Sequence, residues 1–211
     1  MINICHEIHQ MFSQLARLHF PFKKSSIPPN GIYILFEKGE YGHRGERIVR
    51  VGTHTGDGQL SSRLRQHFIV ENKDRSIFRK NIGRAFLNAD NDPYLHVWNL
   101  DLTTRKAKEA YGHLVIPEKQ QQIEQRVSIY LQHNLSFVVF PVENKPDRLR
   151  LESKIISTVS LCPNCCPSDN WLGLKSPKKK IRESGLWLVN ELYKDPLSIG
   201  ELQELRDILG I

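Results

Sequence analysis

Cysteine is scarce in this chain, with four among 211 residues, and three of them lie between Cys162 and Cys166. A secreted domain held by disulfides is shorter and richer in cysteine, so we expect a reducing compartment. No run of 18 apolar residues is present to cross a bilayer. The N-terminal segment also lacks the apolar core of a signal peptide, because polar residues interrupt it between His6 and Gln10. These absences predict a cytoplasmic protein with no membrane partner.

Acidic residues are in deficit, with 23 Asp and Glu against 30 Lys and Arg, and the formal net charge is +7. The excess is concentrated between Arg44 and Arg84, where ten basic residues stand against four acidic ones. Such a surplus favours an anionic partner such as nucleic acid. The candidate nucleic-acid contacts are His54, Arg65, Arg79, Lys80, Arg84, Lys178, Lys179 and Lys180.

Apolar periodicity divides the chain into strands and helices. Alternation predicts strands at 31–36, 47–52 and 94–102, and a nearly continuous apolar run predicts a buried strand at 136–142. Helical spacing predicts helices at 1–17, 60–68, 76–87 and 117–133, another beginning at Asp147, and two closing helices at 186–192 and 199–209. The glycine-rich, charged stretch 37–46 is expected to be a hairpin loop.

The stretch from Gly31 to Phe68 carries three side chains suited to phosphate chemistry. Tyr33 lies on the first strand, and Arg63 and His67 lie four residues apart on one face of the following helix. The planar guanidinium of Arg63 can hold a phosphate. Tyr33 and His67 can transfer protons. Hydrolysis of a phosphodiester requires groups of these kinds.

This arrangement resembles the GIY-YIG nuclease family. The family pattern is Gly-Ile-Tyr on one strand, Tyr-Ile-Gly or a relative on the next, a helix with Arg and often His, then a Glu and an Asn. Residues 31–33 match the first motif, and the helix carrying Arg63 matches in type, spacing and order. Glu152 would be the metal-binding glutamate and Asn170 the late asparagine. The second motif departs from the pattern, because Arg50 stands where the family usually has tyrosine.

The resemblance covers roughly residues 31–172 and implies an α+β fold, with a small mixed or antiparallel sheet flanked by helices. We therefore expect a nuclease domain over 31–172. An N-terminal helix and linker would occupy 1–30, and a basic linker with C-terminal helices would occupy 173–211.

By this resemblance, Glu152 would hold Mg²⁺ or Mn²⁺, and Arg63 would contact the phosphate. Tyr33 would take the proton from the attacking water as general base or relay. A free phenol has a pKa of about 10, so Tyr33 needs help from the metal or a neighbouring cation. Arg50 could supply that charge, and His67 would be a secondary proton carrier.

The implied function is a divalent-metal-dependent DNA endonuclease of a restriction or defence system. This function allows a homodimer and a cognate methyltransferase as partners. Two alternatives stay open at this point. One is a catalytically inactive relative that only binds nucleic acid, and the other is a DNA-repair nuclease.

A further alternative is a zinc-bound interaction protein. The two thiols in Cys162-Pro163-Asn164-Cys165 have a spacing that can begin a zinc site. A second pair of ligands is not adjacent in sequence, so His133 or Cys5 would have to supply it. Otherwise the segment is a tight proline-containing loop.

Overall fold

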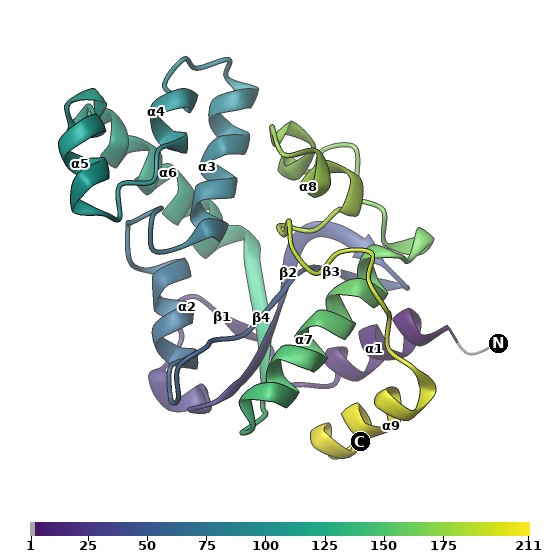
Figure 1. Ribbon diagram of the computed structural model, residues 1–211. Coiled ribbons are helices and arrows are strands. Elements are labelled where there is room, and N and C mark those ends of the chain that lie inside the picture. Colours follow the sequence, from purple (N-terminus) through teal and green to yellow (C-terminus); the bar gives the residue numbers. More distant parts are fainter. Residues whose placement is uncertain (1–2) are drawn as a thin grey trace.

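The structure is a computed structural model in which residues 3–211 are described (Figure 1). Its centre is a four-stranded antiparallel sheet with strand order β1-β4-β2-β3. The strands are β1 (Leu18–His19), β2 (Gly31–Gly42), β3 (Gly45–Gly52) and β4 (Leu135–Pro141). The helices are α1 (Ile4–Ser13), α2 (Leu60–Phe68), α3 (Ile77–Ala89), α4 (Leu95–Asn99), α5 (Arg105–Tyr111), α6 (Pro117–Asn134), α7 (Lys145–Ser160), α8 (Lys179–Ser184) and α9 (Ile199–Leu209). The predicted α+β class is confirmed.

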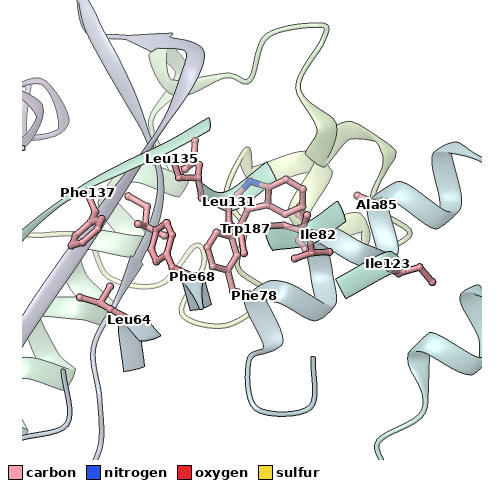
Figure 2. Close-up of a cluster of buried hydrophobic side chains, with 14 of the residues drawn as sticks. Leu64, Phe68, Phe78, Ile82, Ala85, Ile123, Leu131, Leu135, Phe137 and Trp187 are labelled. Carbon is pink, nitrogen blue, oxygen red and sulfur yellow. The ribbon is translucent and has the colours of Figure 1, made fainter. Parts of the chain in front are cut away.

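Period-two alternation sends the side chains of β2 into two separate cores. Tyr33 and Leu35 pack with residues of α2, α3 and α6, whereas Ile32 and Ile34 pack with residues of α1, α7 and α9. Figure 2 shows the first core, in which Trp187, from the segment after α8, packs among side chains of α2, α3 and α6. The sheet is therefore covered on both faces.

Helices from the two ends of the chain lie together on the second face. α1 contacts α9, and Arg206 of α9 forms an ion pair with Glu7 of α1. The division of the chain at residues 30 and 172 stays a prediction. No helix within residues 3–211 is long and apolar enough to cross a membrane.

Three predictions of local structure are wrong. Residues 94–102, expected as a strand, contain α4, because Tyr94, Val97 and Trp98 are buried at helical spacing. Residues 186–192, expected as a helix, form an irregular segment, and the Trp187 N–H donates to the Val49 carbonyl at 2.8 Å on the edge strand β3. The expected loop 37–46 is mostly strand, because β2 and β3 continue to a two-residue turn.

Candidate active site

Tyr33 lies on β2 directly opposite Gly52 of β3. A Cβ atom at Gly52 would overlap the Tyr33 hydroxyl, so the glycine makes the space that the phenol ring occupies. The Tyr33 side chain is 1% exposed. The glycine that ends the second family motif, Gly52, is therefore needed because any side chain there would overlap Tyr33.

Replacing Gly52 by Ala is expected to displace Tyr33 and to destabilise the fold by about 1–3 kcal/mol, the usual cost of overpacking a core. Urea unfolding measures this loss, and a DNA-cleavage assay at a temperature where the variant is folded measures the displacement. Gly45→Ala is the matched control, because a Cβ there meets no atom within 4 Å. Equal stability of the two variants would contradict the steric role of Gly52.

His67 connects Tyr33 to the start of α3. Its Nε2 lies 2.8 Å from the Tyr33 hydroxyl, and its Nδ1 lies 2.7 Å from Ser76 Oγ. Ser76 caps α3 by accepting the Arg79 N–H. Burial, reinforced by the nearby arginines, lowers the pKa of His67 well below its usual value. His67 is therefore neutral, and both of its ring nitrogens are used in hydrogen bonds, to Tyr33 and to Ser76.

Arg50 lies between Tyr33 and the solvent-facing cleft. Its Nε donates to the Tyr33 hydroxyl at 3.4 Å, and its Nη1 donates to the Trp187 carbonyl. The Trp187 indole in turn donates to the buried Glu37 carboxylate at 2.9 Å, as does Trp171 at 3.0 Å. The cation is thus held in place by the backbone of the segment after α8.

Glu152 projects from α7 toward the end of β3. One carboxylate oxygen accepts the Thr53 N–H at 3.1 Å, and this is its one hydrogen bond within residues 3–211. Burial raises the pKa of Glu152 to about 7, although Arg50 and Arg63 oppose that rise. Glu152 is half-buried and lines a cleft, so its second carboxylate oxygen is available to a cation bound there.

Tyr33 and His67 lie buried behind Arg50, whereas Arg50 and Glu152 border one cleft of about 460 Å³, which we call the active-site cleft. Its lining residues are Arg50, Arg63, Ile77, Asn81, Leu149, Glu152, Ile156, Trp187, Leu188, Val189, Asn190 and Glu191. Arg63 also borders a second, polar hollow of about 380 Å³ beside α2. The Arg63 side chain is partly exposed and donates to Gln66 and to the Arg75 carbonyl. It therefore lies where an anion bound in either hollow would meet it.

The donors around Glu152 fit a hard divalent cation. Glu152 offers a carboxylate, and Asn190 brings a further side-chain amide to the same cleft. The other polar lining groups are already bonded, because the Asn81 oxygen accepts from Arg84 and the Glu191 oxygens accept from Ser153 and Lys194. Mg²⁺ is bound in proteins through one or two carboxylates and keeps several waters. One carboxylate in an open cleft therefore suffices for such an ion.

Asn170 is not part of this cleft. It is exposed, and its neighbour Ser168 donates to Glu40 near the turn end of the β2–β3 hairpin, whereas Tyr33 lies at the opposite end. Asn190 lines the cleft instead. The expectation for Asn170 fails because the chain between α7 and α8 runs along the hairpin away from Glu152.

Three of the basic residues expected to contact nucleic acid are used inside the protein. Arg79 has no exposed surface and forms an ion pair with Glu124 at 2.7 Å. Lys80 is bound to Asp74, and Arg84 donates to two asparagine side chains. The basic face of α3 is therefore an internal network and not a binding surface.

The remaining candidates differ in accessibility. His54 is buried, with Nε2 facing the Gly31 N–H at 3.3 Å and Nδ1 facing the Gly56 carbonyl at 2.6 Å, so both ring nitrogens are occupied. Arg65 on α2 and residues 178–180 are exposed. Lys180 donates to the carbonyl of Val189, which lines the active-site cleft. These exposed cations stay candidate DNA contacts.

Sequence reasoning missed the segment that closes the cleft. Trp187, Asn190 and Glu191 carry no motif, and a helix was expected there. The Ser76 hydroxyl that meets His67 had a signal, because serine before an apolar-periodic run marks a helix N-cap.

Comparison with known proteins gives one match. The sequence model of a protein family, described as the GIY-YIG domain, matches residues 2–209. No curated protein and no solved structure matches the chain significantly.

Proposed function

This chain belongs to the GIY-YIG family, and from that membership, which implies cleavage of nucleic acid, we propose that it is a divalent-metal-dependent DNA endonuclease. The observation that carries the proposal is the meeting of Arg50, Arg63 and Glu152 in one cleft, with Tyr33 bound to Arg50. The groups come from β2, β3, α2 and α7, and Glu152 follows Arg50 by 102 residues in sequence.

Glu152 would hold the ion in the cleft that Asn190 also lines, with waters completing the coordination. A bound Mg²⁺ or Mn²⁺ supplies Lewis-acid stabilisation of charge on the phosphate oxygens. Arg63 orients the phosphate and offsets charge that develops on its non-bridging oxygens, an effect worth about 3–4 kcal/mol for a well-placed donor.

Tyr33 acts as a proton relay in this proposal. Its hydroxyl is covered from solvent, so direct attack on water by the phenol, as expected from sequence, would require the neighbouring groups to move. Arg50 donates to the phenol oxygen, where its charge would stabilise the phenolate, and neutral His67 holds the phenol by a hydrogen bond of 2.8 Å. Loss of either Tyr33 or His67 should therefore slow the chemical step.

Incubation of the purified protein with supercoiled plasmid DNA tests the proposal. Nicked or linear product should form with Mg²⁺ or Mn²⁺, and EDTA should prevent it. Glu152→Gln is the matched inactive control, because it changes only the carboxylate. DNA binding without cleavage under both metals would instead identify an inactive nucleic-acid-binding module.

The Arg50 position has its own test, a pH–rate profile at saturating Mg²⁺, where Glu152 is held ionised. Arg50→Lys keeps the charge and should retain most activity at neutral pH. Arg50→Tyr removes the cation beside the phenol, so the pH optimum should move upward or the rate should fall. If Arg50 only contacts a DNA phosphate, both variants change binding and its salt dependence and leave the profile unmoved.

For the biological role we propose restriction or defence, with a cognate methyltransferase and a homodimer as the expected partners. Expression in a host with unmodified DNA should be toxic for the wild type and harmless for Glu152→Gln. A repair nuclease would be tolerated by such a host and would cut damaged or branched DNA in preference to intact duplex.

A further inference from the structure

Four potential metal ligands meet at the turn end of the β2–β3 hairpin, away from Tyr33 and Gly52. They are Cys5, His9, His43 and Cys165, and their ligand atoms all lie within 4.8 Å of one another. Cys5, His9 and Cys165 are 2–5% exposed. None of these side chains contributes to the active-site cleft.

The separations suit tetrahedral coordination. Cys5 Sγ lies 3.6 Å from Cys165 Sγ, and Cys165 Sγ lies 3.9 Å from His9 Nε2. Ligands at Zn–S and Zn–N bond lengths of about 2.3 and 2.0 Å on a tetrahedron are about 3.3–3.8 Å apart. The observed distances therefore leave room for one ion with only small adjustments.

The helix α1 carries two of the ligands, Cys5 and His9, and a hydrogen bond fixes the orientation of the His9 ring. Cys5 and His9 are four residues apart and share a face. His9 Nδ1 faces the Cys5 carbonyl at 2.8 Å, which favours the tautomer with Nε2 unprotonated. A backbone carbonyl on the other ring nitrogen is the usual support of a metal-bound histidine. The Ile48 N–H lies 3.4 Å from His9 Nε2, and this long hydrogen bond would break when Nε2 binds the ion.

His43 occupies an unusual position in the hairpin turn. His43 and Arg44 have φ angles of 53° and 66°, the left-handed pair of a type I′ turn, which Asn-Gly makes at lower cost. Such backbone is usually retained where the side chain has a role. Here the turn places the imidazole beside Cys5 and Cys165.

We propose that Cys5, His9, His43 and Cys165 bind one structural Zn²⁺. Two thiolates and two imidazoles form a closed ligand set that zinc prefers, in contrast to the oxygen donors around Glu152. Binding releases the protons of both thiols. The ion joins α1, the hairpin turn and the segment after α7, which are distant in sequence.

Metal analysis of the freshly purified protein is the primary test. About one zinc per chain is expected in the wild type and in Cys166→Ser, since the Cys166 thiol is exposed and outside the cluster. Cys5→Ser and Cys165→Ser should contain none. Zinc-free wild type that gives four reactive thiols, or a Cys5–Cys165 disulfide in place of zinc, would overturn the proposal.

Two measurements on the wild-type chain do not depend on variant folding. Co²⁺ exchanged into the site should give visible d–d bands of tetrahedral coordination and a thiolate charge-transfer band. A mercurial that blocks thiols should release zinc to a colorimetric chelator. Absence of both signals rejects the site.

The fourth ligand can be assigned separately. Cys162 Sγ lies 3.2 Å from His43 Nε2 and is the competitor for that position. We expect His43→Asn to lose zinc and Cys162→Ser to retain it, and the reverse result would overturn the assignment of His43. Glu152→Gln should keep its zinc, so the failure of the nuclease proposal and the failure of the zinc proposal are distinguishable.

Discussion

Replacing Glu152 by Gln is expected to lower DNA cleavage at least about a hundredfold while leaving the fold intact. The substitution removes the carboxylate that would hold the metal but preserves the size of the side chain and its acceptor for the Thr53 N–H. Single-turnover cleavage with saturating Mg²⁺ measures the loss. Activity close to wild type would place the metal elsewhere.

The same substitution should stabilise the metal-free protein at alkaline pH. The pKa of Glu152 is raised from 4.5 to about 7 by burial, so its protonated form is favoured in the folded state. Stability is therefore greatest below pH 4.5 and falls as pH rises toward 7, by up to about 3 kcal/mol for this group. Glu152→Gln escapes that loss, and its melting temperature in EDTA should exceed that of the wild type at pH 8 but match it at pH 4.5.

Metal and proton compete for the Glu152 carboxylate, which gives a check on both results. At limiting Mg²⁺ the cleavage rate of the wild type should rise with pH through about 7. Saturating Mg²⁺ should move that rise to lower pH, because the ion favours the ionised form. If the rate rises at the same pH at all Mg²⁺ concentrations, the titrating group is a residue other than Glu152.

Periodicity was sufficient to predict most of the fold. The apolar alternation of β2, the continuous run of β4 and the capped pattern of α9 each encode one structure locally. The prediction for residues 94–102 was wrong because so short an alternating segment cannot separate strand from helix. Packing of Trp98 against Gly83 fits the helix observed there. The segment from 186 to 192 has its conformation fixed by a distant partner, the edge of β3.

In the candidate site, too, some residues could be predicted from local sequence and others depend on distant contacts. Tyr33, Arg63 and Glu152 could be named as candidates from sequence, because residue type, spacing and element order together define a family pattern. Arg79 could not, because an exposed arginine and one buried against Glu124, 45 residues away, have the same local sequence. Of the proposed zinc ligands, Cys5 and Cys165 already stand in the zinc alternative drawn from sequence. His9 and His43 could not be predicted, because only the fold brings them beside the two thiols.

Replacing Arg63 by Ala is also expected to lower the rate of cleavage at least about a hundredfold, with DNA affinity less affected. The guanidinium borders both hollows and is partly exposed, so its removal leaves no cavity in the core. Arg65→Ala is the matched control on α2, because that exposed side chain lines neither hollow. It should weaken binding in a salt-dependent way and leave the single-turnover rate at saturating DNA unchanged.

Arg63→Lys separates charge from geometry at this position. Lysine keeps the positive charge but lacks the planar fork that pairs with two phosphate oxygens. If Arg63 stabilises the transition state by two directed hydrogen bonds, Arg63→Lys should recover binding and only a small part of the lost rate. Full recovery of the rate would mean that charge alone suffices. An Arg63→Ala variant with reduced affinity and a normal single-turnover rate would reduce Arg63 to a DNA contact and leave the transition-state charge to Arg50 and the metal.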